Sequence, residues 1–454
     1  VFLLCPLIYL LYSVIGLSLD TFVYLWNNLL LGYSLNTLYL LLLTVFFSLI
    51  LGIIPAWFVS TTNFKGKSFF DIILFLPLAI PSYIIAFTYS DLLSYTGPIQ
   101  SIVRNNYPDL YKYVNHDYLQ IEILAFLMAL VLYPYLYTAC RISFSLLGSN
   151  YINISKNLGM SQFQTFFKII LPISRVSIFS GLFLIIMEVL NEYGAVKYFG
   201  VNTFTSGIFR SWYSMEDINT ASILAVCLLI IVSIFFLLER YSTSKYRYNY
   251  KPNDKVSGNY STNKFSRIVI YLICLFPFIL GFFIPVIYII NNVFKTINVI
   301  DFSELLNLSL NSFFLASVSS LIIVAIAILF QYIKKIAKSK TVFYLSEIVS
   351  LTYALPGAVI ALSLIILLAF LTKLIGVSIA FGSVVILVYA YVMRYMAVGI
   401  SPLRSSFDKH PETFDDTGKN LGMTNFKLFK KIHLPINISA IYIAFILCLS
   451  LIHI

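Results

Sequence analysis

Long apolar runs separated by short polar stretches occupy this chain from end to end. Eleven of the runs approach or exceed about 20 residues, the length at which an apolar helix spans a bilayer. They lie near residues 1–17, 35–59, 69–93, 119–142, 174–193, 219–239, 268–292, 309–333, 343–371, 374–397 and 436–454. The runs have almost no polar face, which helices of a large soluble protein would need. The pattern predicts an all-α fold, a polytopic transmembrane helical bundle.

Composition and charge placement favour the same class. The chain is 60% hydrophobic and 11% charged, with a mean hydropathy of +0.90, whereas soluble domains carry about 25% charged residues. The net charge is +11, and basic residues gather in alternate loops, which the positive-inside rule places in the cytoplasm. These loops carry Lys65, Lys67, Arg141, Lys156, Lys168, Arg240, Lys245, Arg247, Lys251, Lys334, Lys338, Arg394 and Arg404. The first span then begins inside, and topology explains the basic loops better than nucleic-acid binding does.

One polar segment occurs twice. Residues 156–173 read KNLGMSQFQTFFKIILPI, and residues 419–436 read KNLGMTNFKLFKKIHLPI, with 12 of 18 positions identical. The offset is 263 residues throughout, and both copies fall in the loops expected to be cytoplasmic. A duplicated polar element between spans predicts a membrane protein with two-fold pseudo-symmetry that contacts a soluble partner at two equivalent places.

The duplication extends to most of the chain. Asn36-Thr37 and Asn311-Ser312 open corresponding spans, and Ile80-Pro81 and Leu355-Pro356 share the same offset of 275. We therefore expect two tandem six-span-like halves. The expected division is a first span and outer loop (1–35), a first half (36–240), a cytoplasmic linker with an extra span and outer loop (241–308), and a second half (309–454).

Both ends of the sequence lie inside apolar runs. No initiator Met precedes Val1, and the last six residues, LSLIHI, are what CTG TCT CTT ATA CAC ATC encodes, a sequence that resembles a transposon-end adapter. An ordinary apolar tail is the alternative. We expect a fragment with about eleven spans present and the twelfth truncated.

Catalytic and metal-site patterns are missing from the sequence. The five cysteines are scattered singly, the four histidines show no ligand spacing, and no Ser/His/Asp arrangement occurs. Gly66-Lys67-Ser68 resembles the end of a phosphate-binding loop, but Thr61 stands where that loop needs a glycine. We expect a protein that is not an enzyme and that binds no cofactor itself; any metal site is left unknown.

The repeated segment has the signals of a sharp turn between two helices. Gly159 and Gly422 can adopt the left-handed conformation that ends a helix. Ser161 and Thr424 can then cap a short helix, and Ser161 with Gln164 can form a capping box. Pro172 and Pro435 are expected to stop that helix before the next span. Phe163, Phe166 and Phe167 would give it an apolar face, as would Phe426, Leu428 and Phe429.

This pattern resembles the EAA loop of binding-protein-dependent ABC importer permeases, and the resemblance covers nearly the whole chain. It implies that each short helix docks in a groove of a separate ATPase, present in two copies, which binds ATP and Mg²⁺. It also implies a periplasmic binding protein and a multi-pass chain in the bacterial cytoplasmic membrane. The Glu-Ala-Ala triplet departs from the family, reading Asn153-Ile154-Ser155 and Asp416-Thr417-Gly418. A charged contact is therefore in doubt for the first half. The coupling residues carried over are Asn153, Ser155, Gly159, Ser161, Phe163, Phe166 and Pro172, then Asp416, Gly418, Gly422, Thr424, Phe426, Phe429 and Pro435.

Most permeases of this family are separate chains, so the resemblance of a chain with two fused halves implies a permease for iron(III), thiamine or one of a few other solutes. The stretch 192–212, EYGAVKYFGVNTFTSGIFRSW, resembles the iron(III) permease signature. Thiamine is the second choice, followed by polyamines or another small solute.

A candidate translocation path lies beside that stretch. Glu188, Asn191 and Glu192 share a helix face at i, i+3 and i+4, with Tyr193 adjacent. Oxygen ligands of this kind suit a hard cation, and carboxylates within spans usually face a cavity. The alternative is that the two glutamates pair with Lys197 or Arg210 and only hold the structure together.

An ion-coupled secondary transporter is the competing class. Such transporters with internal repeats have broken helices and ionisable residues at the membrane midplane. The strongest repeat here is instead expected in the cytoplasm, which favours the importer permease.

Topology can be tested with single cysteines in a background that lacks the native ones. A cysteine at position 251 or 338 should be shielded from an impermeant thiol reagent added outside, and one at position 105 should react. Labelling of position 251 from outside would contradict the orientation.

Overall fold

The computed structural model describes residues 4–16, 19–244, 260–261, 263–337, 355–376, 383–411 and 413–453. Apart from a two-residue parallel pairing of β1 (Thr62–Asn63) with β2 (Tyr260–Ser261), its regular elements are helices, which confirms the all-α prediction. Over these ranges seven helices could cross a membrane, and three bent helix pairs raise the number to ten. The shorter apolar helix Cys5–Ile15 accounts for the first expected run. Most of the basic linker and parts of the runs 343–371 and 374–397 lie outside the described residues.

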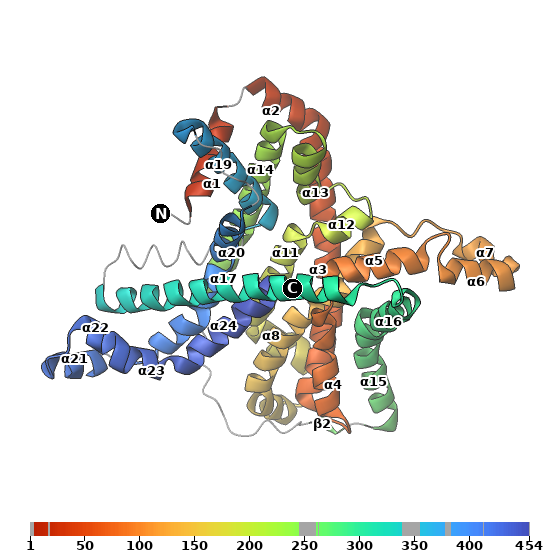
Figure 1. Cartoon of the computed structure of the whole chain (residues 1–454). Coiled ribbons are helices and arrows are strands. Elements are labelled where there is room, and N and C mark those ends of the chain that lie inside the picture. Colours follow the sequence, from red (N-terminus) through yellow and green to blue (C-terminus); the bar gives the residue numbers. More distant parts are fainter. Residues whose placement is uncertain are drawn as a thin grey trace. The chain divides into compact units, whose positions relative to one another are not determined.

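The chain forms two compact units. One unit comprises residues Leu17–Asn298. Its helices (Figure 1) are α2 (Leu19–Leu25), α3 (Leu31–Thr61), α4 (Lys67–Ile73), α5 (Ser82–Leu93), α6 (Pro98–Asn106), α7 (Pro108–Val114), α8 (Ile121–Asn157), α9 (Gln162–Thr165), α10 (Leu171–Ile173), α11 (Arg175–Asn191), α12 (Gly194–Tyr198), α13 (Phe204–Phe209), α14 (Ile218–Ser244), α15 (Lys264–Phe278) and α16 (Ile284–Thr296). Single π-helical turns over 26–30, 166–170, 210–214 and 279–283 and a 3₁₀ turn over 76–79 connect some of them.

Helix α8 forms the centre of this unit. In its most apolar stretch 72% of the residues are buried, compared with at most 44% in the other unbroken spans. Helices α3 and α11 approach α8 through glycines that face Leu136. A Cβ at Gly181 would lie 2.9 Å from the Cα of Leu136, and a Cβ at Gly52 would lie 3.2 Å from its Cβ. Small residues permit such close helix contacts, which is how spans associate inside a bilayer.

The other unit comprises Val1–Gly16 and Val299–Ile454. Its helices are α1 (Cys5–Ile15), α17 (Phe302–Ala337), α19 (Gly357–Ile375), α20 (Val384–Phe407), α21 (Thr413–Asn420), α22 (Asn425–Leu428), α23 (Leu434–Ile436) and α24 (Ile438–His453), with a π-helical turn over Phe429–His433. Helices α17, α20 and α24 share one hydrophobic core. Gly399 of α20 occupies the place of Leu136, and its partners at the repeat offsets are the buried Ala327 and Ala444. The same three-helix junction is thus filled by differently sized side chains.

Two expected elements differ from the structure. Residues 22–61 form one continuous helical span of 40 residues, so the outer loop expected before residue 36 is largely helical. The run near 69–93 is a bent pair, Lys67–Ala79 and Ser82–Asn106, with 86° between the helices. Pro81 stands at the break, and the missing N–H of proline explains why the helix does not continue.

Candidate functional site: two coupling segments and a junction at Glu192

Each copy of the repeated segment opens with the same left-handed turn. Gly159 has φ +70° and Gly422 has φ +73°, as the sequence predicted. The N–H of Gly159 donates to the carbonyl of Lys156 (2.9 Å), and the N–H of Met160 donates to that of Ser155 (2.9 Å). The second copy repeats both bonds at Gly422 and Met423, over 2.9 and 3.0 Å. This double closure is the Schellman motif, which satisfies carbonyls that the ending helix would leave unpaired.

A capped helix follows each turn. The Ser161 hydroxyl accepts from the N–H of Gln164 and the Gln164 side chain accepts from the N–H of Ser161, so the predicted capping box is confirmed. Thr424 caps the second helix by accepting from the N–H of Lys427. Both short helices include a π-helical turn, and each meets the next span at a bend of 71°.

Each segment exposes large apolar side chains at matching positions. Phe163 is 72% exposed and Phe426 74% exposed, and Leu158 and Leu421 are each 70% exposed. In each segment the leucine lies just before the glycine turn and the phenylalanine lies on the short helix after it; exposed apolar side chains grouped in this way are typical of a docking surface. The two leucines were not among the predicted coupling residues, although the same residue occurs at this place in both copies.

Phe166 and Phe429 are not among these exposed side chains. The Phe166 ring packs 5.0 Å from that of Trp57, and the Phe429 ring packs 4.8 Å from that of Tyr332. The exposed Phe163 and Phe167 rings lie 4.5 Å apart on the outer side of the helix, and Phe166 meets Phe167 edge-on at 4.9 Å. Phe166 and Phe429 therefore anchor the segments to their own units.

The two triplets that replace Glu-Ala-Ala also contain one exposed and one buried coupling residue each. Asn153 and Asp416 are exposed, so both remain available to a partner. Ser155 is buried and donates its hydroxyl proton to the carbonyl of Tyr151 (2.6 Å). Gly418 is buried too, and a Cβ there would lie 3.1 Å from Cδ1 of Leu428. A small third residue thus lets the helix before the turn pack against the helix after it.

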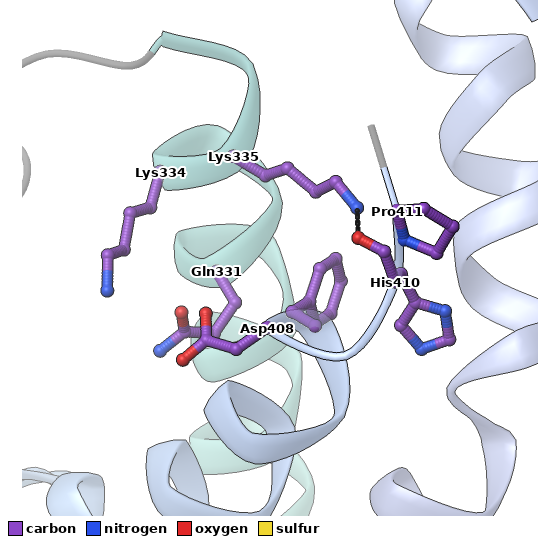
Figure 2. Close-up of a pocket in the computed structure, with 7 residues that line it drawn as sticks. Gln331, Lys334, Lys335, Asp408, His410 and Pro411 are labelled. Atoms are coloured by element: carbon purple, nitrogen blue, oxygen red, sulfur yellow. Dashed lines mark hydrogen bonds between the residues drawn. The ribbon is translucent and has the colours of Figure 1, made fainter. Parts of the chain in front are cut away.

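A cavity of about 390 Å³ adjoins the start of the second segment (Figure 2). It is lined by Gln331, Lys334, Lys335, Phe407, Asp408, His410 and Pro411. The amide nitrogen of Gln331 is buried there and has no hydrogen-bond partner among the described residues. Burial and the nearby Lys335 and His433 hold the pKa of His410 below its usual value, while Asp415 opposes this shift.

The proposed path residues meet at a junction formed by Glu192. Its carboxylate accepts from the N–H of Ala195 (2.8 Å), and the Gly194 N–H and the Ser82 side chain donate to it as well. The Glu192 carbonyl accepts from the Thr205 hydroxyl over 2.7 Å. Glu192 thus ties together the ends of α5, α11, α12 and α13 through backbone N–H groups and hydroxyls. This is a structural role like the predicted alternative, although that alternative named Lys197 or Arg210 as the partner.

The remaining path residues surround this junction. Glu188 and Asn191 are half-buried on α11, and Asn191 donates its side-chain amide to the carbonyl of Met187. The Tyr193 ring lies 4.1 Å from that of Phe209 and 5.7 Å from the Lys197 ammonium. Among the described residues, no group of three or more His, Cys, Asp or Glu side chains could hold a metal ion.

Comparison with known proteins agrees with this architecture. Residues 48–248 match the family described as binding-protein-dependent transport system inner membrane component. The Fe(3+)-transport system permease protein FbpB 2 of Haemophilus influenzae is 25% identical over 423 residues, which is 91% of this chain and 77% of that relative. The sulfate transport system permease protein CysT of Salmonella typhimurium is 25% identical over 157 residues, 34% of this chain and 54% of the relative. The molybdenum transport system permease protein ModB of Haemophilus influenzae is 28% identical over 160 residues, 35% and 67% respectively.

The apolar helices and the matched segment define a multi-pass membrane permease, a class of transport subunit rather than of enzyme. Residues 48–248 carry the domain of binding-protein-dependent importer permeases, and over most of its length the chain resembles an ABC importer permease. Such permeases act with an ABC ATPase and a substrate-binding protein.

Replacing Glu192 with alanine should destabilise the protein. The change leaves buried donors of α12 unpaired, which costs about 1–3 kcal/mol for each unsatisfied group. The melting temperature of the purified permease should fall, whereas alanine at the exposed Glu304 should leave it unchanged. Equal melting temperatures for both variants would contradict the junction.

Proposed function

We propose that this chain is the transmembrane subunit of an ATP-driven importer that moves iron(III) into the cytoplasm. A periplasmic binding protein delivers the iron, and two copies of a separate ABC ATPase bind ATP and Mg²⁺ and dock on the two coupling segments. The subunit lies in the bacterial cytoplasmic membrane and works by alternating access. The observation that carries the docking step is the recurrence of one turn, one cap and one exposed aromatic at an offset of 263 residues.

The segment geometry suits the transmission of a mechanical movement. Backbone hydrogen bonds close the helix before each turn, a side-chain cap starts the short helix after it, and this helix runs into the next span within a single bend. A displacement of the exposed Phe163 or Phe426 is therefore passed to α11 or α24 rather than absorbed in a loose loop. Inward-packed Phe166 and Phe429 transmit the same displacement to α3 and α17.

Iron is the substrate best supported by similarity. The match to the Fe(3+)-transport permease extends over 91% of the chain, while the matches to the sulfate and molybdenum permeases cover about a third. We place the translocation path along Glu188, Asn191, Glu192 and Tyr193. In this arrangement Glu188 faces the cationic substrate, and Glu192 keeps the surrounding helix ends together.

Coupling can be tested at the two glycines. Valine at position 159 or 422 is strained by about 1–2 kcal/mol in the left-handed conformation, so the turn should open. In the reconstituted complex, ATPase stimulation by the loaded binding protein and uptake should both fall severalfold. We expect the larger loss at Gly422, because Asp416 accompanies it.

Gly376 provides the matched control for this test. It ends α19 with φ +74° and has open space around its Cα, so valine there imposes the same strain outside the coupling segments. Gly376→Val should keep coupled transport. Unchanged stimulation and uptake in both Gly159→Val and Gly422→Val would exclude docking through these turns.

Substrate identity can be tested by uptake into vesicles that contain the complete complex. Radiolabelled iron(III) should enter when ATP and the loaded binding protein are supplied, and Glu188→Gln should reduce entry without abolishing ATP hydrolysis. Entry of thiamine, a polyamine, sulfate or molybdate but not iron would overturn the iron assignment. Uptake driven by an ion gradient without ATP would instead indicate the secondary transporter.

A further inference from the structure

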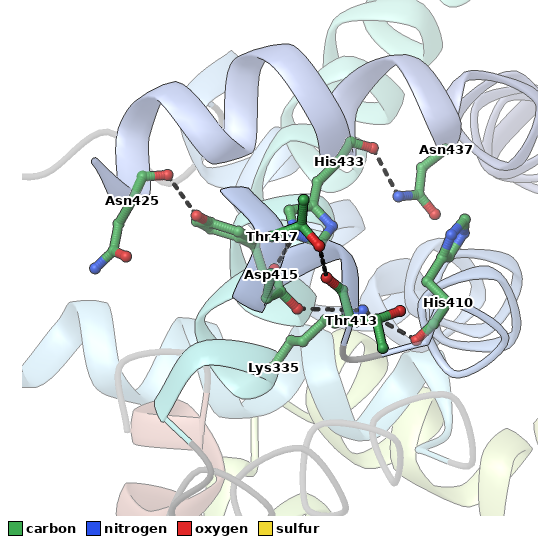
Figure 3. A network of polar contacts seen from close by, with 9 residues as sticks. Lys335, His410, Thr413, Asp415, Thr417, Asn425, His433 and Asn437 are labelled. Atoms are coloured by element: carbon green, nitrogen blue, oxygen red, sulfur yellow. Dashed lines mark hydrogen bonds and ion pairs between the residues drawn. The ribbon is translucent and has the colours of Figure 1, made fainter. Parts of the chain in front are cut away.

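A buried polar network fastens the second coupling segment to its own unit (Figure 3). The ring Nε2 of His433 lies 2.6 Å from Oδ1 of Asp415, and the ammonium of Lys335 lies 3.6 Å from Oδ2 of the same carboxylate. Lys335 also donates to the carbonyl of His410 over 3.2 Å. His433 is 1% exposed. We call Lys335, Asp415 and His433 the polar clamp.

The clamp joins elements that are distant in sequence. Asp415 lies in α21 before the glycine turn, His433 ends the π-helical turn after it, and Lys335 lies at the end of α17. The His433 ring stacks on Phe407 at 5.7 Å with 13° between the planes, and it lies 5.1 Å from Tyr332. Tyr332 in turn donates its hydroxyl proton to the carbonyl of Asn425. Both arms of the segment are thereby held against α17 and α20.

The first half fills the corresponding places with apolar side chains. At the offset of 263, Asp415 corresponds to Ile152 and His433 to Ile170, and these isoleucines are 1% and 0% exposed. Tyr332 corresponds to Trp57 at the offset of 275. At these two places the first segment is held by apolar packing, whereas the second uses a hydrogen-bonded carboxylate and imidazole.

This difference makes the second segment sensitive to single changes. The Asp415 carboxylate, 15% exposed, is tolerated because its partners are present, and removing one partner leaves the others without compensation. Replacing both members of such a pair with well-packed apolar residues avoids that penalty. The first half already uses this apolar solution at Ile152 and Ile170.

We propose that Asp415 and His433 are positioning residues, which hold the second coupling segment in the orientation needed to engage the ATPase. This proposal rests on the proposed function only where it invokes the ATPase. The fastening itself is a property of the permease alone and can be measured without a partner.

A spin label tests the fastening. In the full-length permease without its native cysteines, a nitroxide at position 426 should give one slow component in its spectrum. Asp415→Ala and His433→Ala should each add a fast component, while a nitroxide at position 163 should be unaffected by either change. Asp415→Asn keeps the shape of the side chain and provides a milder variant should alanine prevent folding; it should add a smaller fast component. Unchanged spectra at position 426 in all three variants would overturn the proposal.

Titration with the ATPase then tests the consequence for docking. The concentration of ATPase subunit that gives half-maximal stimulation should rise about tenfold in Asp415→Ala, as expected when one partner of a buried pair is lost, while the maximal rate stays near that of the unmodified protein. The double variant Asp415→Ile with His433→Ile should restore both the slow spectrum and the affinity. A folded single variant with a reduced maximal rate and unchanged half-saturation would overturn the positioning role. Absence of stimulation in the unmodified complex, with the spectral changes intact, would instead reject the proposed function.

Discussion

The left-handed glycine turn is the constraint on which the coupling face depends. Backbone groups of a span are satisfied inside its helix, so a chain that leaves the span sharply must close the last carbonyls by other means. Gly159 and Gly422 do this with two backbone hydrogen bonds each, because a residue without Cβ adopts positive φ without strain. The turn directs a short capped helix away from the span and presents Phe163 or Phe426 at its surface. Loss of the turn would remove the orientation of every exposed side chain that follows it.

The two halves reach this geometry with different chemistry. Aromatic side chains anchor both segments, through Phe166 on Trp57 and Phe429 on Tyr332. The second half adds a carboxylate, Asp415, at the place where the first half has the buried Ile152. Duplication thus preserved the shape of the segment, while the contacts that attach it to its unit diverged. A change that disrupts the contacts of Asp415 is expected to affect the second segment and not the first.

Local features of the fold could be predicted from sequence because neighbouring residues determine them. The apolar runs, the left-handed glycines, the capping box and the stops near Pro172 and Pro435 all follow from short-range physics. The inward direction of Phe166 depends on Trp57, more than a hundred residues away, and was not predictable from helix spacing alone. The same holds for the junction at Glu192, whose donors include Ser82, and for the clamp, which needs Lys335 beside Asp415.

Site-directed cross-linking tests the central claim, that two equivalent segments contact the ATPase, most directly. Single cysteines at positions 163 and 426 would be reacted with a short bifunctional reagent in membranes that contain the assembled complex. Position 113, 82% exposed on α7 in a loop expected outside, serves as the control. The account predicts a cross-linked product of permease and ATPase from positions 163 and 426 and none from position 113. No product from either coupling position in an assembled, ATP-hydrolysing complex would contradict it.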